Sequence, residues 1–396
     1  MSDRLNESPR LNVHIRQRGL VVDTTLHNPK PNQAAKREIR DTQVLIRDTH
    51  EFTRPNGVSG LAFNTEAHQH DRKYEIDHEG SHTSIGGNAV NVGIAYLNTL
   101  RAFDTTGTLA PETFFHSKVT NAEVQRLLQG VIPDEQYQLS SRPKSETREG
   151  YYVPHQDRLL YLAVHKPHLQ EEHDPLGGDQ HRAETHFISS TAEKTPVWHE
   201  LIARIKNNPG SNLVLMPGKN RLTESVEDEV MKVTDLITFN KAEAVAYLKR
   251  RHPDLLKNIE ERTDLLAMAI SVMGPQRALI TNGGDTVALY ERGMKEAILV
   301  EPPAIEASRE IVRDKVQNIV TSAIPIYTGC GDTLVGVFMA LEKLTKVGTL
   351  DLSIKEQLQL AVNISSCHAW SPASNISYLQ PNQMRQLAKA VTKKAA

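Results

Sequence analysis

The sequence contains few cysteines and no long hydrophobic run. Among 396 residues there are two cysteines, Cys330 and Cys367, and their separation does not match a metal-ligand spacing. No segment approaches the roughly 18 consecutive apolar residues of a transmembrane helix. The charged N-terminal segment also lacks the apolar core of a secretory signal. Together these absences predict a cytoplasmic protein.

The sequence also lacks a strong excess of charge of one sign. Its formal net charge is −2 at pH 7, and neither half has a long run of like charges. Proteins that bind nucleic acids or membrane surfaces usually carry a marked basic region. We therefore predict small-molecule partners, with no nucleic acid and no membrane. The 39% of hydrophobic residues is enough for a large core.

The second half of the chain alternates short apolar runs with amphipathic stretches. Residues 213–216, 236–239 and 278–281 have the composition of short buried strands, and residues 225–233 and 243–250 are predicted helices. Strands that alternate with helices usually form a parallel sheet with helices on both faces. The predicted fold class is therefore α/β, with a doubly wound, mainly parallel sheet.

The first half predicts a smaller β component. Residues 73–77 alternate polar and apolar side chains, and residues 151–164 have the pattern of a β-hairpin. Residues 1–40 are rich in Arg, Asn, Pro and Asp, so we interpret them as an N-terminal extension with one short strand at 20–22. The main domain is then expected over residues 41–396.

The strongest chemical signal is a glycine-rich turn before a predicted buried helix, Thr328-Gly329-Cys330-Gly331-Asp332. Glycines at a helix start let a ligand approach the backbone, and the free N–H groups there attract anions. A carboxylate at this point indicates a general base that takes a proton from a hydroxyl group. The alternative is a tight turn in which Asp332 caps the helix. The turn lacks the third glycine of a dinucleotide-binding fingerprint, and the sequence contains no P-loop.

A second turn, Gly86-Gly87-Asn88-Ala89-Val90-Asn91, precedes a predicted helix over residues 88–100. Asn88 and Asn91 are three positions apart, which places both carboxamides on one face of the helix near its start. Carboxamides in this position can hydrogen bond to sugar hydroxyls. The alternative is simple capping of the helix by Asn88.

These two turns resemble the two signatures of the ribokinase (PfkB-type) carbohydrate kinase family. Two further motifs lie between them, in the order that the family shows. Asn240-Lys241-Ala242-Glu243 resembles the N-x-x-E motif, and Thr281-Asn282-Gly283 resembles the T-x-G turn. The similarity extends over residues 43–380, and between residues 100 and 210 it rests on pattern alone.

The resemblance implies a ribokinase-like kinase domain with a small β lid, whose strands are expected within residues 55–85 and 147–165. It makes Asp332 the general base. The backbone N–H groups that hold the transferred phosphate are then those of the preceding turn: Gly329, Cys330 and Gly331.

The same resemblance implies the ligands and the residues that bind them. The cofactors are ATP and Mg²⁺, with a monovalent cation as a further candidate. Two residues are expected to act on Mg²⁺ through water: Asn240 and Glu243. Three are expected beside the nucleotide: Thr281, Gly283 and Asn363. Three are expected to bind the acceptor substrate: Gly87, Asn88 and Asn91. A homodimer formed through the lid is also expected.

Three positions depart from the family pattern. Ile326 stands where relatives usually have Asp, and Met216 ends a strand where many have Asp or Asn. Cys330 replaces a common Ala. The N-terminal Asp that binds the acceptor in relatives has two candidates here, Asp23 and Asp48.

The motifs predict a kinase that transfers the terminal phosphate of ATP to a hydroxyl of a sugar, a sugar derivative or a nucleoside. The alternative is a catalytically silent relative that binds a nucleotide or sugar and regulates a partner. A sugar-phosphate acceptor calls for basic lid residues, for which the candidates are Arg72, Lys73, Arg148 and Arg158. A nucleoside calls for aromatic stacking, for which the candidates are Tyr151, Tyr152 and Tyr161.

Two weaker features are interpreted as surface features. Residues 155–199 contain scattered histidines, whose spacing favours surface loops over a metal site: His155, His165, His168, His173, His181, His186 and His199. Lys219 and Arg221 follow a strand end and are expected in a solvated loop rather than on phosphate.

Overall fold

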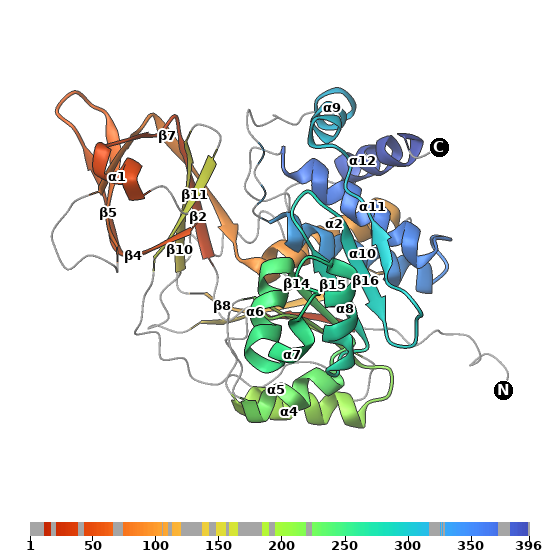
Figure 1. Ribbon diagram of the computed structural model, residues 1–396. Helices are drawn as coiled ribbons and strands as arrows, with labels where there is room; N and C mark the ends of the chain where they lie inside the picture. Colours follow the sequence, from red (N-terminus) through yellow and green to blue (C-terminus); the bar gives the residue numbers. More distant parts are fainter. Residues whose placement is uncertain are drawn as a thin grey trace.

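The largest sheet of the protein runs through the centre of the main domain (Figure 1). The structure, a computed structural model, describes residues 12–16, 21–38, 43–65, 74–104, 106–109, 113–119, 137–141, 148–155, 158–164, 184–189, 195–218, 224–316, 325, 327, 329–370 and 381–394. Within these residues the large sheet has nine strands, in the order β17 (Ile298–Val300), β16 (Val287–Glu291), β15 (Arg277–Thr281), β14 (Leu236–Asn240), β13 (Asn212–Met216), β12 (Glu184–Ser189), β1 (Asn12–Arg16), β8 (Thr113–Val119) and β9 (Tyr137–Ser141).

The strands from β15 to β9 in this order pair in parallel, and β16 and β17 complete the sheet in antiparallel pairing. A parallel sheet of this kind needs both of its faces covered. Its strands accordingly alternate between two cores: Val214 of β13 lies in one, while Leu213 and Leu215 lie in the other.

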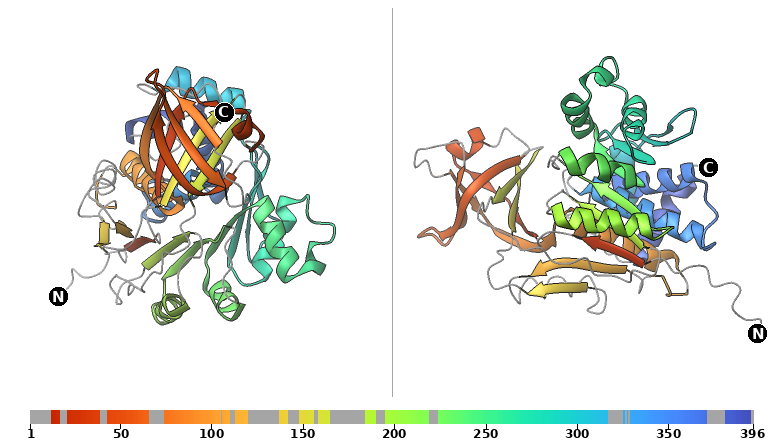
Figure 2. Two further views of the ribbon diagram at one scale, coloured as in Figure 1. Left: turned by 90° about the vertical axis from the view of Figure 1, so that its left-hand side faces the viewer. Right: turned by 90° about the horizontal axis from the view of Figure 1, so that it is seen from below.

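Helices cover both faces of the sheet (Figure 2). One core is formed with α2 (Asn88–Phe103), α9 (Ile305–Lys315), α10 (Cys330–Lys346), α11 (Ile354–His368) and α12 (Pro381–Lys394). The other is formed with α4 (Thr195–Asn207), α5 (Glu224–Val233), α6 (Lys241–Arg251), α7 (Pro253–Leu256) and α8 (Thr263–Val272). The predicted α/β doubly wound class is confirmed.

A second, strongly curved sheet lies to one side of the main domain (Figures 1 and 2). It has eight strands, in the order β3 (Lys30–Pro31), β6 (Tyr74–His78), β5 (Ser59–Thr65), β4 (Gln43–Thr53), β11 (Arg158–Val164), β10 (Arg148–His155), β2 (Val21–His27) and β7 (Gly80–Gly86). A short helix, α1 (Gln33–Glu38), packs on it. The sheet has its own small core, which includes Leu61, Phe63, Ile76 and Leu162.

The N-terminal part of the chain requires a correction. The extension expected over residues 1–40 is wrong for its described segments, because β1 lies inside the main sheet and β2 lies inside the curved sheet. The curved sheet therefore uses β2, β3 and β4 in addition to strands from the expected ranges 55–85 and 147–165. The predicted hairpin is present, since β10 and β11 pair in antiparallel fashion.

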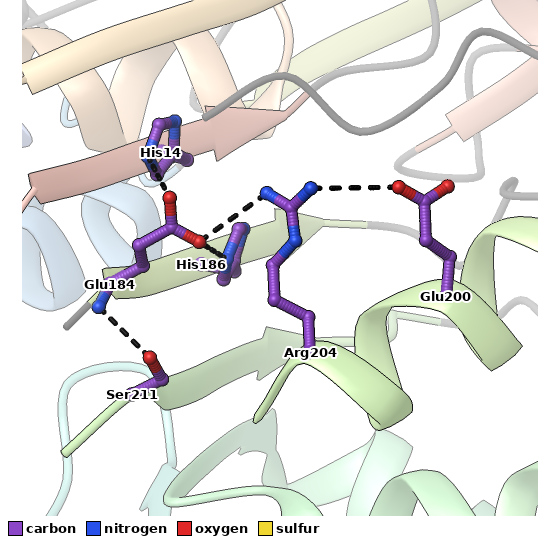
Figure 3. A network of polar contacts seen from close by, with 6 residues as sticks. All are labelled: His14, Glu184, His186, Glu200, Arg204 and Ser211. Carbon is purple, nitrogen blue, oxygen red and sulfur yellow. Dashed lines mark hydrogen bonds and ion pairs between the residues drawn. The ribbon is translucent and has the colours of Figure 1, made fainter. Parts of the chain in front are cut away.

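A buried polar network holds β1 in place (Figure 3). The Glu184 carboxylate, fully buried at the start of β12, lies 3.2 Å from His14 Nε2 and 3.0 Å from His186 Nε2. The guanidinium group of Arg204 on α4 lies 3.4 Å from the same carboxylate and 3.6 Å from the carboxylate of Glu200. Burial alone raises the pKa of Glu184, but the close approach of His14 and His186 holds it well below its usual range. The network thus connects β1, β12 and α4.

His186 corrects one sequence-based prediction, because it is a fully buried strand residue rather than a surface-loop histidine. His199 is exposed on α4. His155 lies on β10, and the other histidines of that group fall outside the described part of the chain. Among the described helices, none combines the length and the apolar character needed to span a bilayer.

Candidate active site

Asp332 lies in the first turn of α10 and is 6% exposed. The helix starts after Gly329, which has a φ of 83° and so adopts a left-handed conformation that glycine tolerates best. No side chain caps the helix, so the alternative interpretation of Asp332 as a cap is wrong. The buried carboxylate of Asp332 has a partner on another helix instead.

The second turn brings its asparagines to this carboxylate. Gly87, with a φ of 102°, precedes α2, and no side chain caps this helix either. The capping role considered for Asn88 is therefore wrong. Instead, Asn91 Nδ2 donates a 2.9 Å hydrogen bond to Asp332 Oδ2. The carboxamide of Asn88 also acts on Asp332 and lowers the pKa of its carboxyl group. Among the described residues, no partner reaches the buried Oδ1 atom of Asn91.

Gly336 allows α2 and α10 to approach this closely. A Cβ atom at Gly336 would lie 2.3 Å from the backbone oxygen of Val92 and 2.8 Å from Ala95 Cβ, so only glycine fits. Gly336 is not among the site residues predicted from the sequence. Its signal is a glycine inside an otherwise apolar helix, which usually has a packing reason.

The environment of Asp332 shifts its titration towards neutral pH. Burial raises the pKa of Asp332 from 3.8 to about 7. The hydrogen bond from Asn91 opposes this increase, whereas the charge of Glu243 adds to it. Such a carboxyl group can accept a proton near neutral pH and release it again, as a general base must.

The N-x-x-E motif begins α6 at the carboxyl end of β14. Asn240 Oδ1 accepts a 2.8 Å hydrogen bond from the N–H of Glu243, and Glu243 Oε2 accepts one of 3.1 Å from the N–H of Asn240. This is a capping box, which holds both side chains at the helix start. Since the charge of Glu243 affects Asp332, the two motifs face a common region.

The oxygen-rich motif suits Mg²⁺ bound largely through water and substrate oxygens. In the part of the chain that the structure describes, no group of three His, Cys, Asp or Glu side chains forms a ligand set. Mg²⁺ commonly binds through one or two carboxylates while it keeps several waters. Asn240, which is exposed, and Glu243, which is half-buried, fit that mode.

The T-x-G motif lies beside Asn240. Thr281 is the last residue of β15 and pairs in register with Asn240 of β14. Gly283 follows in a turn with a φ of 57°. Asn363 lies half-buried on α11, where its Oδ1 accepts a 3.0 Å hydrogen bond from Gln359. The strand ends thus bring two of the four motifs together.

Of the three residues that depart from the family pattern, the structure describes two, and both lie at the glycine-rich turn. A Cβ added at Gly331 would lie 3.8 Å from Met216 Cε, so a thioether lies beside the glycine-rich turn. Burial raises the pKa of the Cys330 thiol well above its usual range, which disfavours a reactive thiolate. Thr328 and Ile326 lie outside the described residues.

The acceptor-side candidates lie on the curved sheet. Asp23 belongs to β2 and Asp48 to β4, and the backbone of Asp23 pairs with Ser84 of β7, the strand that leads into α2. Of the tyrosine candidates, Tyr151 packs against the small core of that sheet. Arg148 and Tyr152 lie on β10, and Arg158 and Tyr161 lie on β11. Arg72, Lys73, Lys219 and Arg221 fall outside the described residues.

Comparison with known proteins gives structural matches and no sequence match. No family model and no curated protein matches the sequence. The Anopheles gambiae adenosine kinase in complex with P1,P4-di(adenosine-5) tetraphosphate is 13% identical, with a TM-score of 0.57 and coverage of 95% of this chain and 99% of that one. Ribokinase from Thermotoga maritima is 11% identical, with a TM-score of 0.54 and coverage of 96% and 99%.

A third match is the Arabidopsis thaliana ribokinase complexed with ribose and ATP. It is 13% identical, with a TM-score of 0.53, and the alignment covers 97% of this chain and 99% of the other. These matches extend over both the main domain and the curved sheet. The chain therefore has the ribokinase-like fold of PfkB-type sugar and nucleoside kinases.

Proposed function

We propose that the protein is a kinase that transfers the terminal phosphate of ATP to a hydroxyl group of a small molecule. The observation that carries the proposal is the buried carboxylate of Asp332, with a pKa of about 7 at an uncapped helix start. Asn91 hydrogen bonds to this carboxylate, and the charge of Glu243 acts on it. Burial of a carboxylate is costly, and a catalytic task accounts for its presence here.

In the proposed reaction, Asp332 takes the proton of the acceptor hydroxyl. The acceptor oxygen forms a bond to the terminal phosphorus of ATP, and the bond from that phosphorus to the bridging oxygen breaks to leave ADP. The N–H groups of Gly329, Cys330 and Gly331 bind the oxygens of the transferred group, because a helix start favours negative charge. Positioning and charge stabilisation supply most of the catalysis in phosphoryl transfer.

The remaining motifs have binding roles in this proposal. Asn240 and Glu243 hold Mg²⁺ through water, and the bound ion neutralises phosphate charge. Thr281, Gly283 and Asn363 bind the nucleotide, with a monovalent cation as a further ligand of this region. The ATP bound in the Arabidopsis thaliana ribokinase supports this choice of donor.

The acceptor is a sugar, a sugar derivative or a nucleoside that Gly87, Asn88 and Asn91 bind. The buried Oδ1 atom of Asn91 supports this role, since it can accept a hydrogen bond from another hydroxyl of the acceptor. The packing of Tyr151 in the small core leaves Tyr152 and Tyr161 as the stacking candidates for a nucleoside. A thermal-shift screen of sugars, sugar phosphates and nucleosides, each with a non-hydrolysable ATP analogue, identifies the class.

Asp332→Asn tests the catalytic proposal. We expect turnover to fall by at least about 10²- to 10⁴-fold, the usual contribution of a general base, while the Kd of the ATP analogue stays within a few-fold of wild type. Normal turnover in this variant refutes the role of Asp332. No turnover in the wild-type protein, with ligand-induced stabilisation retained, supports the silent relative that regulates a partner.

A cytoplasmic location and a homodimer formed through the curved sheet are further parts of the proposal. The edge strand β7 pairs on one side with β2, and such an edge can accept a strand from a second copy. Sedimentation at working concentration tests the dimer, and a monomer would refute it.

A further inference from the structure

A chain of two hydrogen bonds links α11 to the end of β17. Gln359 Nε2 donates a 2.9 Å hydrogen bond to the backbone oxygen of Glu301 and a 3.0 Å hydrogen bond to Asn363 Oδ1. Glu301 directly follows β17, and Gln359 and Asn363 lie one turn apart on α11. A pair with this spacing can simply stabilise a helix. The bond to Glu301 adds to that role, because it fixes the pair against the main sheet.

These two bonds determine which atom of Asn363 faces outward. A backbone oxygen only accepts hydrogen bonds, so the atom of Gln359 that faces Glu301 must be the amide nitrogen. The same nitrogen can only donate to Asn363, so the Asn363 atom turned towards Gln359 must be Oδ1. The Nδ2 atom of Asn363 is therefore on the other side of the carboxamide.

The Nδ2 atom of Asn363 is available to a ligand. The side chain is half-buried, and its contact with Gln359 uses Oδ1 alone. Among the described residues, no acceptor lies within hydrogen-bond distance of Nδ2. Asn363 thus presents a hydrogen-bond donor whose orientation Gln359 controls.

The end of β17 lies at the same edge of the main sheet as the N-x-x-E and T-x-G motifs. β17 runs parallel to β15, because each of them pairs with β16 in antiparallel fashion. Asn240 pairs with Thr281, and the register of β16 continues this row to Val300, the residue before Glu301. Three strand spacings separate β14 from β17 in the sheet, or about 14 Å at about 4.8 Å each.

A nucleotide bound along this edge can reach both ends of the row. The proposed function places its terminal phosphate near Asn240 and its middle near Thr281. An extended nucleoside triphosphate spans a length of this order, so its base lies beyond β17, on the side of Asn363. Unprotonated ring nitrogens of adenine accept hydrogen bonds, which suits the donor that Asn363 presents.

We propose that Gln359 is a positioning residue that holds Asn363 with Nδ2 towards the nucleobase, where it donates a hydrogen bond to a ring nitrogen of adenine. The inference rests on the proposed nucleotide site and not on the chemistry of Asp332. Without Gln359 the carboxamide can turn over and present Oδ1, whose lone pairs face those of the ring nitrogen unfavourably.

Isothermal titration calorimetry on the full chain, with Mg²⁺ and without acceptor, tests the contact with the base. The probes are ATP and its 1-deaza, 3-deaza and 7-deaza analogues, each of which replaces one ring nitrogen by C–H. We expect one analogue to bind about three- to tenfold more weakly than ATP in wild type, and equally to ATP in Asn363→Leu. Equal affinity of wild type for ATP and all three analogues overturns the proposal.

Gln359→Met tests the positioning role, because methionine has a similar length and donates no hydrogen bond. We expect the Kd of ATP to rise about threefold or more and the preference for ATP over the weak analogue to decrease. In the Asn363→Leu background the same change should have no further effect, since Gln359 acts through Asn363. Gln276→Met, at an exposed position just before β15 and at the opposite end of the sheet, is the control.

Circular dichroism and thermal unfolding confirm that the variants are folded. A merely structural role of Gln359 would lower stability and leave the preference for ATP over the analogue unchanged, which overturns the proposal. So does an effect of Gln359→Met that persists in full in the Asn363→Leu background, or an equal effect of Gln276→Met.

These binding measurements are independent of turnover. Turnover of ATP with no preference among the analogues overturns the role of Gln359 and leaves the kinase proposal intact. The expected preference without turnover of any acceptor has the reverse meaning. Absence of ATP binding by wild type overturns both.

Discussion

The carboxamide of Asn91 donates a 2.9 Å hydrogen bond to the carboxylate of Asp332, which follows it by 241 residues in the chain. This bond favours the ionised form of Asp332, whereas burial favours the protonated form. The balance leaves the pKa of Asp332 at about 7, where a general base is most useful.

We first predict the pH dependence of catalysis. Because Asp332 must be ionised to accept a proton, kcat/KM should rise with pH and level off above about 7. Asn91→Leu removes the hydrogen bond to the ionised form, so the midpoint should move to higher pH. Asn382→Leu, at an exposed position of α12, is the control. A flat profile between pH 5 and pH 9 would contradict the assignment.

The second prediction concerns stability. The pKa of Asp332 is about 7 in the folded protein and 3.8 in the unfolded chain, so the folded state binds this proton more tightly. Wild-type stability should therefore fall as the pH rises from about 4 to about 7. The Asp332→Asn variant has no carboxyl group to ionise at this buried position. It should therefore be more stable than wild type by about 1–4 kcal/mol at pH 8.

Denaturant unfolding at pH 4 and pH 8 measures this difference. At pH 4 the carboxyl group is protonated in the folded protein and about half ionised in the unfolded chain, so the two proteins should differ in stability by less than about 1 kcal/mol. A variant that is less stable than wild type at pH 8 would show that the ionised carboxylate stabilises the fold.

The third prediction tests the close packing of α2 and α10. Gly336→Ala places a Cβ atom 2.3 Å from the backbone oxygen of Val92, so the helices must move apart. We expect a loss of about 1–3 kcal/mol of stability and a lower kcat, since Asn91 moves away from Asp332. Gly284→Ala, where nothing lies within 4 Å of the added Cβ, is the matched control for stability. Equal stability of the two variants would disprove the packing argument.

The fourth prediction concerns the network in Figure 3. Glu184→Gln leaves the buried Arg204 without its main countercharge and should cost about 3 kcal/mol at pH 7. The pKa of Glu184 is lowered from 4.5 by folding, so this contribution is present above pH 4.5 and is lost as the pH falls below it. The difference in stability between wild type and the Glu184→Gln variant should therefore become smaller at acid pH.

Glu200→Gln provides the comparison for this network, because it removes the exposed partner of the same arginine. The Glu200 side chain is 36% exposed, so its loss should cost less than about 1 kcal/mol. Thermal unfolding of both variants at pH 4 and pH 7 measures the two costs. Similar costs at pH 7 would mean that the buried pair contributes no more than the exposed one.

The features that depend on residues close together in the chain could be predicted from the sequence. The strand and helix alternation of the second half is confirmed, and so is the start of α10 after a glycine-rich turn. Both depend on local composition and short spacing. The proximity of Asp332 to Asn91 followed from the resemblance and not from the residues alone, because it depends on tertiary packing at Gly336.

The strand β1 could not be predicted, because its sequence does not look like that of a central strand. A strand in the middle of a parallel sheet is usually a continuous apolar run, yet Asn12-Val13-His14-Ile15-Arg16 alternates polar with apolar residues. His14 is tolerated there because Glu184, which is 170 residues away in the chain, pairs with it.

The position of β1 has a consequence for synthesis of the protein. Its two neighbours, β8 and β12, are made about 100 and 170 residues after it, so the segment leaves the ribosome long before either pairing partner exists. Closing loops of this length is entropically costly and slows folding. The strand β1 can pair on both of its sides only after Glu184–Ser189 has emerged, and until then this amino-terminal segment is accessible to chaperones.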